Sequence, residues 1–310
     1  MYRSAIDVEG LDAIDVHVHI EVGADGHPSL PDALAEAARR YFKADGVTPD
    51  LASVAAYYRE RRMAAVVFTV DARTQLGHSP ISSESIIEQA ADYADVLIPF
   101  ASVDPRLGAE AVDLARALVL EHGARGFKFH PTVQGFDPSA PEFRALWSAI
   151  TELGVPALVH TGQTGIGAGT PGGSGFRLRY SNPMLLDDVA ADFPDLQLIL
   201  AHPSVPWQDE AISMATHKSN VVIDLSGWSP RYFPPQLVRA AGSFLQDAVL
   251  FGSDFPLLTP DRWLRDFAQL ELDEAIRAKI LKDNAVRILG LAAPAANPAA
   301  TPAVTEENTA

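Results

Sequence analysis

The chain has 310 residues, of which 47% are hydrophobic and 21% are charged, so it can bury a sizeable core and does not belong to the intrinsically disordered class. Its formal net charge of −16 disfavours nucleic acid and anionic membranes as partners, but it allows an anionic small molecule held by local arginines. The absence of cysteine excludes disulfides, thiolate metal sites and cysteine nucleophiles, which leaves histidine and carboxylate as metal ligands. The sequence also has no apolar run that could span a bilayer and no signal-peptide pattern at its start, and it therefore predicts a cytoplasmic protein.

Eight short apolar segments alternate with helix-like stretches along the chain. Several of these segments are almost continuously hydrophobic, as expected of parallel strands buried on both faces. Eight strand–helix units predict a closed (β/α)8 TIM barrel, of the α/β class. An open doubly wound sheet is the alternative, but no Gly-x-Gly-x-x-Gly turn follows the first strand. The predicted strands are residues 13–20, 64–71, 96–104, 126–131, 156–162, 196–204, 220–227 and 248–256.

Two connections between these strands are unusually long. Residues 21–63 follow the first strand as an insertion, and residues 163–182 follow the fifth strand and contain six glycines. A glycine-rich connection of this length is expected to be mobile or to wrap closely around a ligand. Residues 1–290 are predicted to form one barrel domain, and residues 291–310, which lack apolar periodicity, a disordered tail.

The most informative segment is 15–19, in which two histidines lie two residues apart inside the first apolar run. Alternate residues of a strand share one face, so His17 and His19 are expected to point the same way. Two neutral imidazoles side by side suit a divalent transition metal. The alternative is a pair of core histidines, each bonded to a backbone carbonyl.

Other strands also end in ionisable side chains. In a barrel of this kind the active site lies at the carboxyl ends of the strands. Each such residue alone could be a core histidine with hydrogen-bonded ring nitrogens or the cap of a turn. Burying all of them together without a metal or a substrate would carry a large free-energy cost. The strand-end residues are His17, His19, Lys128, His130, His160, His202, Asp224 and Asp254.

Segments 15–19, 158–162, 199–203 and 251–256 together resemble the amidohydrolase superfamily, in the branch that contains aminocarboxymuconate semialdehyde decarboxylase. The resemblance implies one divalent metal, zinc before manganese or iron. It implies that the metal is bound by His17, His19, His160 and Asp254. It also implies that His202 polarises the substrate or moves protons, and that Asp254 doubles as the base that deprotonates water.

Lys128 has two interpretations. Binuclear members of the superfamily carry a carboxylated lysine on the fourth strand that bridges two metals, whereas the resembled branch uses one metal. A cationic contact to an anionic substrate is therefore the preferred role for Lys128. His130 shares its face and is expected to line the same pocket.

Aromatic and basic residues beyond the strand ends bear on the substrate. Trp207 and Trp228 favour a flat, aromatic substrate, although ordinary packing on the barrel rim is the alternative. Arg177 and Arg179, in the glycine-rich connection, are candidates to grip an acidic group such as the phosphates of coenzyme A, with solvated surface arginine as the alternative.

Segments 126–131, 180–183 and 223–230 resemble actinobacterial hydrolases of aryl β-ketoacyl-CoA thioesters. This resemblance implies hydrolytic retro-Claisen cleavage to an aromatic acid and acetyl-CoA. The alternatives are a non-oxidative decarboxylase of an aromatic or muconate-type acid and, third, a lactone or amide hydrolase. A catalytically inactive barrel used as a scaffold is disfavoured because all expected ligands are present. The sequence leaves open whether two copies of the chain form a homodimer.

Overall fold

The structure is a computed structural model that describes residues 1–42 and 48–291. It contains a strand in each of the eight predicted segments, and every neighbouring pair is parallel. Most of the strands are shorter than the predicted segments, but His19, His160 and Asp224 are the last residues of their strands, at the mouth of the barrel. The strands are β1 (Ala13–His19), β2 (Met63–Phe68), β3 (Leu97–Pro99), β4 (Phe127–Phe129), β5 (Ala157–His160), β6 (Leu198–Ala201), β7 (Val221–Asp224) and β8 (Val249–Leu250).

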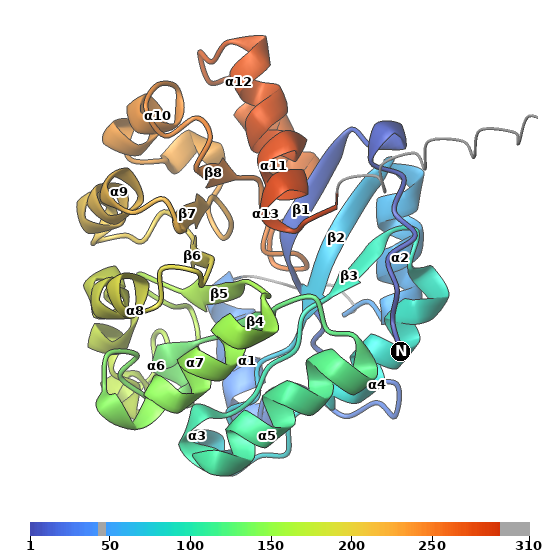
Figure 1. Cartoon of the computed structure of the whole chain (residues 1–310), viewed down its shortest axis with the longest axis vertical. Coiled ribbons are helices and arrows are strands. Elements are labelled where there is room, and N and C mark those ends of the chain that lie inside the picture. Colours follow the sequence, from blue (N-terminus) through green and yellow to red (C-terminus); the bar gives the residue numbers. More distant parts are fainter. Residues whose placement is uncertain (43–47, 292–310) are drawn as a thin grey trace, which may run out of the picture.

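The strands close into a barrel in chain order (Figure 1). The ladders run β1-β2-β3 and β4-β5-β6-β7-β8. A parallel bridge between Ala101 and Phe127 joins the segment after β3 to β4, and another between Val18 and Phe255 joins the segment after β8 to β1. The (β/α)8 barrel expected from the sequence is therefore confirmed.

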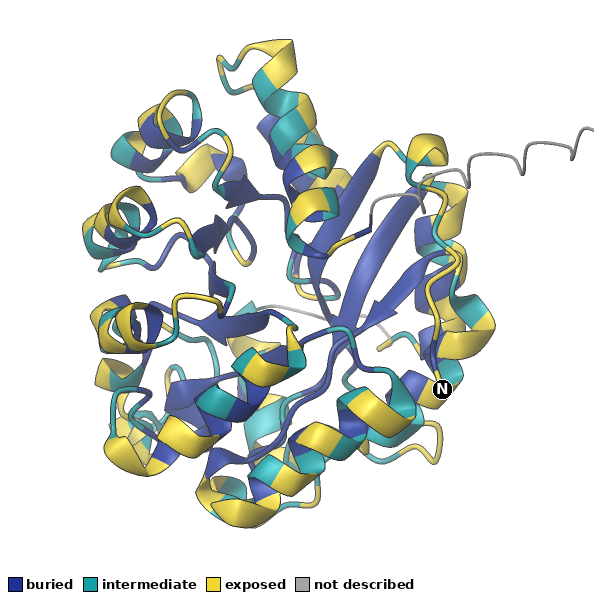
Figure 2. Ribbon diagram, viewed as in Figure 1, coloured by how far each residue is buried: buried dark blue, intermediate teal, exposed yellow. Residues whose placement is uncertain are grey.

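Helices surround the ring of strands on its outside (Figure 1). Their outer faces are exposed, and their inner faces are buried against the strands (Figure 2). The helices are α1 (Asp32–Phe42), α2 (Leu51–Glu60), α3 (Arg73–Leu76), α4 (Ser83–Ala90), α5 (Ala109–Ala117), α6 (Pro131–Gln134), α7 (Arg144–Leu153), α8 (Asp187–Asp192), α9 (Gln208–His217), α10 (Pro235–Ala241), α11 (Pro260–Phe267), α12 (Glu274–Ala278) and α13 (Asn284–Ile288). Among the described residues, none of these helices has the length and apolar character needed to cross a lipid bilayer.

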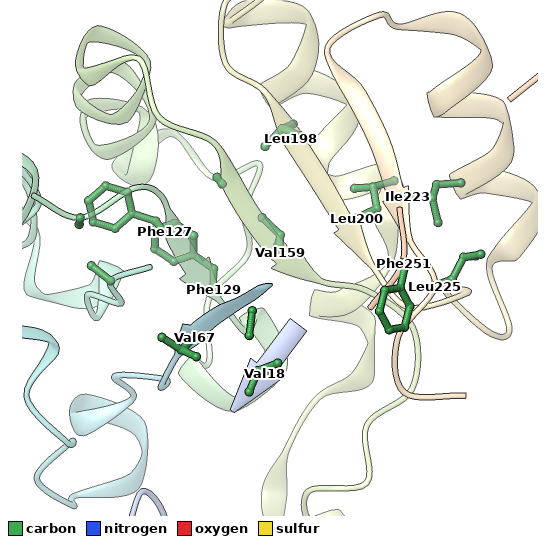
Figure 3. Packing of buried hydrophobic residues seen from close by; sticks show 14 of the residues in the cluster. Val18, Val67, Phe127, Phe129, Val159, Leu198, Leu200, Ile223, Leu225 and Phe251 are labelled. Atoms are coloured by element: carbon green, nitrogen blue, oxygen red, sulfur yellow. The ribbon is translucent and has the colours of Figure 1, made fainter. Parts of the chain in front are cut away.

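The hydrophobic core has two parts, as alternation along buried strands requires. The larger part fills the space between strands and helices (Figure 3), where Phe129 of β4 meets Trp147 of α7 edge to face. The smaller part fills the barrel interior with residues such as Val66, and it includes Ala285 and Leu289 of the last described segment. Leu291, assigned to the tail from sequence, belongs to this inner cluster; the remaining predicted tail, 292–310, lies outside the described residues.

β1 contains an irregularity that places the histidines. Asp15 pairs with Ala65, but Val18 pairs with Val67, so β1 has one residue more than β2 across this step. Such a bulge breaks the strict alternation of faces. As a result Asp15 lies on the outer side of the barrel, while His17 turns to the inner side.

The two long connections meet above the barrel mouth. The first contains α1 in addition to α2, the helix that packs on β2. The second contains two short 3₁₀ segments, Pro171–Gly175 and Leu178–Ser181. A Cβ atom on Gly165 would lie only 2.1 Å from the Phe42 ring, so glycine is needed where the second connection passes under the end of α1.

Candidate metal centre

Three predicted metal ligands come together at the mouth of the barrel. His17 Nε2 and His19 Nε2 are 3.2 Å apart. Asp254 Oδ1, from the segment after β8, lies 3.3 Å from His17 Nε2 and 3.2 Å from His19 Nε2. Two imidazole nitrogens and a carboxylate oxygen at this spacing form a donor set suited to a divalent metal.

Asp224 fixes the orientation of the His17 ring from the side opposite the other two metal ligands. Its Nδ1 lies 2.6 Å from Asp224 Oδ2, and Ser226 donates a further hydrogen bond to the same carboxylate. Because Nδ1 carries the proton that it donates to Asp224, the lone pair of Nε2 points towards the other two donors. This carboxylate–histidine arrangement is typical of metal sites.

His160 and His202 form the other side of the centre. His202 Nδ1 lies 3.1 Å from the carbonyl of Ser226, and His202 Nε2 lies 2.9 Å from His160 Nδ1. A carbonyl only accepts, so His202 carries its proton on Nδ1, and His160 donates from its own Nδ1. The lone pair of His160 therefore sits on Nε2, a buried atom that has no hydrogen-bond partner within the described residues. An unpartnered buried nitrogen beside the donor set fits a fourth metal ligand.

Four buried histidines in and around this centre, His17, His130, His160 and His202, are kept neutral. Burial, helped by the nearby Lys128, holds the pKa values of His17, His130 and His160 well below the ordinary range. Burial also lowers the pKa of His202 to about 4, although Asp254 opposes the shift. Neutral imidazoles are the form that binds metal. The residues present thus fit one divalent metal held by His17, His19 and Asp254, with His160 as the fourth predicted ligand.

Asp254 stays ionised in the same surroundings. Burial alone would raise its pKa, but the hydrogen bond with His19 and the electrostatic effect of the nearby His19, His202 and Lys128 bring the pKa below the usual range. An ionised carboxylate is both a ligand and a proton acceptor at neutral pH. The backbone is strained here, because Asp254 and His202 both have positive φ, 74° and 73°. Strain of this kind at non-glycine residues concentrates at functional sites.

Lys128 lies beneath the centre and does not line the cavity. Its Nζ is 3.1 Å from His17 Nε2 and 4.8 Å from the centre of the Phe68 ring. Burial lowers the pKa of Lys128. The position of Lys128 does not support the predicted contact with the substrate, which stays a prediction. In the structure its side-chain nitrogen lies next to the metal ligand His17.

Asp15 has a structural part in the centre. It accepts hydrogen bonds from the Tyr58 hydroxyl on α2 at 2.7 Å and from the Ser253 hydroxyl at 2.5 Å. Ser253 immediately precedes Asp254, so these bonds tie the ligand-bearing segment after β8 to β1. Buried polar groups that are all satisfied hold a site rigidly.

The centre opens into a cavity of about 370 Å³. Of the predicted substrate-binding residues, His130 and Trp228 line it. The His130 ring stacks on His160 with 3.7 Å between ring centres. Its Nε2 lies 3.3 Å from the hydroxyl of Thr164, another residue of the cavity wall. The wall thus presents flat aromatic surfaces next to the donor set, which suits a planar ligand.

Three other predicted substrate-binding residues lie away from this cavity. Trp207 precedes α9 as its N-cap. Arg177 borders a separate hollow of about 320 Å³ that also includes Arg106. Arg179 is exposed beside the Tyr180 ring. Only residues 163–166 of the glycine-rich connection line the cavity, and Trp207 does not line it, so the substrate contacts of Trp207, Arg177 and Arg179 stay predictions.

Several cavity residues had no signal in the sequence. Glu21 lies 3.4 Å from His19 Nδ1, in the position that Asp224 takes towards His17. Tyr41 and Phe42 reach the cavity from α1, and Arg262 reaches it from α11. The first three belong to the insertion, whose path no periodicity predicts, and Arg262 resembles any surface arginine of a helix.

The family model for amidohydrolases matches residues 14–291. The chain belongs to the amidohydrolase family. The match spans every strand and every residue of the metal centre, and it agrees with the donor set found in the barrel mouth. Among curated proteins, none has a significantly similar sequence.

Solved structures with this barrel are similar over nearly the whole chain. An uncharacterised TIM-barrel protein from Bordetella bronchiseptica shares 20% identity with a TM-score of 0.71, covering 90% of this chain and 98% of its own. The 2,6-dihydroxybenzoate decarboxylase from Rhizobium shares 16% identity with a TM-score of 0.67, covering 91% and 99%. A dihydroxybenzoic acid decarboxylase from Polaromonas with bound manganese shares 17% identity with a TM-score of 0.61, covering 91% and 97%.

Replacing Asp224 by asparagine is expected to weaken metal binding by this amidohydrolase about 10–100-fold, without abolishing it. Asparagine fills the same space, but its amide is a weaker acceptor for His17 Nδ1–H and can present its NH₂ group instead. Competition with a chromophoric chelator measures the change in the dissociation constant. Metal affinity equal to that of the unchanged protein would show that Asp224 does not orient His17.

The metal-free amidohydrolase is expected to lose stability as the pH falls from 6.5 to 4. Histidines with lowered pKa values bind protons more readily in the unfolded chain, so the free energy of unfolding decreases with falling pH. His202 alone accounts for roughly 3 kcal/mol of this loss, because burial lowers its pKa from 6.5 to about 4 and a pKa difference of one corresponds to about 1.4 kcal/mol. Buried Asp15 and Asp224, whose pKa values are raised by burial, act in the opposite direction but are outnumbered by the four histidines. Urea unfolding across this pH range measures the slope; a stability that rises towards pH 4 would contradict it.

Proposed function

We propose that this amidohydrolase uses a divalent metal to break a carbon–carbon bond in an aromatic substrate, by hydrolytic retro-Claisen cleavage of an aryl β-ketoacyl-CoA thioester. The observation that carries the proposal is the donor set of His17, His19 and Asp254 at the base of a cavity with aromatic walls. The resemblance of segments 126–131 and 223–230 to hydrolases of such thioesters supports the choice of substrate.

The cavity rim supports a substrate that is longer than the cavity itself. Tyr41, Tyr232 and Leu257 line the cavity, yet they are 51%, 62% and 41% exposed. Exposed apolar side chains gathered at one site mark a surface that a ligand covers. Arg262 lies on the same rim. A thioester whose aryl end lies at the donor set would extend its chain across this rim, and Arg262 would place a positive charge near its phosphates.

The chain's own residues have defined tasks in this reaction. When bound, the metal polarises the ketone and makes water more acidic. Asp254 accepts a proton from the water that adds to the ketone carbon beside the ring. The bond between that carbon and the neighbouring methylene then breaks, and its electron pair leaves on the thioester enolate. The enolate carbon takes up the proton, which gives acetyl-CoA and the aromatic acid. His202 lines the cavity and would pass this proton through its Nε2, which would have to release the hydrogen bond from His160 Nδ1 to do so.

Non-oxidative decarboxylation of an aromatic acid is the second candidate. Two solved structures of similar fold are decarboxylases of dihydroxybenzoates. The same donor set, which leaves room for a carboxylate and an adjacent hydroxyl, would suit such an acid. The bond between the ring and the carboxyl carbon would break, carbon dioxide would leave, and a proton would be delivered to the ring carbon.

Substrate conversion by the reconstituted protein separates these candidates. The protein is loaded with zinc or manganese and is incubated with benzoylacetyl-CoA and, separately, with 2,6-dihydroxybenzoate; chelator-treated protein is the control. Formation of acetyl-CoA and benzoate in equal amounts is the expected result. Release of carbon dioxide from the dihydroxybenzoate alone would favour the second candidate. Conversion of neither by metal-loaded protein would reject the proposal.

A further inference from the structure

A small side pocket opens from the cavity wall. Its volume is about 50 Å³, whereas a cavity needs only about 10–15 Å³ to hold one water molecule. It shares four lining residues with the main cavity, and the pocket therefore lies directly beside the space above the donor set. The shared residues are His19, Glu21, His130 and Ile166.

Thr69, which follows β2, gives this pocket a polar atom. The residue lines the pocket and is 2% exposed. Its hydroxyl has no hydrogen-bond partner within residues 1–42 and 48–291. Buried hydroxyls nearly always have a partner, so an unpaired one in a pocket wall indicates a ligand group. The other unpaired atom at this cavity is His160 Nε2, which the metal is expected to use.

The remaining walls restrict what the ligand group can be. Leu30, Val70, Leu76 and Val133 surround the pocket with apolar surface. Burying a charge against such walls is costly. The Glu21 carboxylate, which accepts a hydrogen bond from Ser29, also lines the pocket and repels an anion. The group that fits is small and neutral, with one oxygen for a hydrogen bond.

We propose that this pocket is a subsite for a ring substituent, and that Thr69 determines specificity there. With the carbonyl end of an aromatic substrate at the donor set, a hydroxyl or methoxy group on the ring enters the pocket. The Thr69 hydroxyl then forms the hydrogen bond that it lacks in the free protein. The inference rests on the aromatic substrate of the proposed function, and it adds that the substrate ring carries a small neutral oxygen substituent.

Binding of aromatic acids to the metal-loaded full-length protein tests the subsite without requiring turnover. Isothermal titration is carried out with benzoate, with 3- and 4-hydroxybenzoate, and with isophthalate and terephthalate. At least one hydroxybenzoate is expected to bind about tenfold more tightly than benzoate, the effect of one buried hydrogen bond. The dicarboxylates are expected to bind more weakly than benzoate.

Three variants separate recognition from folding. Thr69→Val keeps the shape and is expected to reduce the preference for the hydroxylated ring to near one, with benzoate affinity and melting temperature unchanged. Thr69→Ser keeps the hydroxyl and retains the preference. Thr132→Val is the matched control, because this buried hydroxyl is already bonded to Ser181 at 2.7 Å; it should lower the melting temperature but leave the preference intact.

The possible failures are distinct. If Thr69→Val still prefers the hydroxylated acid as strongly as the unchanged protein does, the proposed subsite is wrong. Binding of benzoate in the same experiment would still support the aromatic substrate of the proposed function. Tight binding of a dicarboxylate overturns the neutral character of the pocket. If the unchanged metal-loaded protein binds none of these acids, the aromatic substrate itself is rejected, and the subsite with it.

Discussion

Replacement of His17 by alanine is expected to abolish metal binding and activity together. His17 is fully buried, and its Nε2 lies within 3.3 Å of both other donors. Alanine removes a ligand and leaves Asp224 buried without its partner. Activity should fall at least about a thousandfold, because a metal contributes several kcal/mol to stabilising charge in the transition state. Elemental analysis of the purified variant should find less than about one tenth of a metal ion per chain.

A surface histidine provides the control for this prediction. His217 is exposed at the end of α9, so His217→Ala should retain both metal and activity. Circular dichroism separates loss of the metal from loss of the fold. A folded His17→Ala protein that kept a full equivalent of metal and turned over substrate would show that the donor set is not the metal centre.

Replacement of His202 by asparagine is expected to separate metal binding from turnover. His202 is not one of the donors, yet it lines the cavity and orients His160 through a 2.9 Å hydrogen bond. Asparagine tolerates the positive φ of 73° at this position. At saturating metal the variant should bind one equivalent, with a dissociation constant raised no more than about 10–100-fold. Its kcat should fall by about 10²–10⁴, the range for loss of a proton-transfer group.

The contrast between the two variants is the informative measurement. Metal content and kcat, determined on the same preparations, should fall together for His17→Ala, whereas only kcat should fall for His202→Asn. If His202→Asn also failed to bind metal at saturating concentrations, His202 would have to be a ligand. If its kcat were unchanged, neither proton transfer nor the orientation of His160 would matter to the reaction.

The barrel could be predicted from the sequence because each of its strands is a local signal. A run such as Val66 to Phe68 is apolar on both faces, and only a strand buried on both faces needs that pattern. The order of such runs and helices then leaves few topologies. The ends of the strands were less predictable, because the polar residues there serve the candidate site and do not mark where the strand pairing stops.

The sequence predicted the site residues that lie at strand ends. It did not predict the site residues that long-range packing brings into the cavity. His17, His19 and Asp254 are brought together by the barrel itself. Glu21 and Phe42 enter the cavity through the insertion, and nothing in their local sequence indicates that path. Arg177 follows a ligand-bearing strand in the sequence, but in the structure it borders a separate hollow, so its contact with the substrate stays a prediction.

The hydroxyl of Thr69 illustrates a further limit of sequence reasoning. A threonine at the end of an apolar strand is ordinary, and only its lack of a partner makes it informative. That property depends on every neighbouring residue at once. No pattern along the chain could have distinguished Thr69 from Thr132, whose hydroxyl is satisfied.

The extra residue in β1 limits how this centre can be copied into another barrel. If Asp15, His17 and His19 were grafted together onto a regular strand with Asp15 facing outward, both imidazoles would also face outward towards the helices, because the shift between Asp15 and Val18 would be lost. A functional transplant would have to carry the bulge together with its anchor, in which Asp15 binds Tyr58 and Ser253. In a strand without the extra residue, Asp15 and the two histidines would all face the same side, so this chain could not have both the outward anchor and the inward metal ligands.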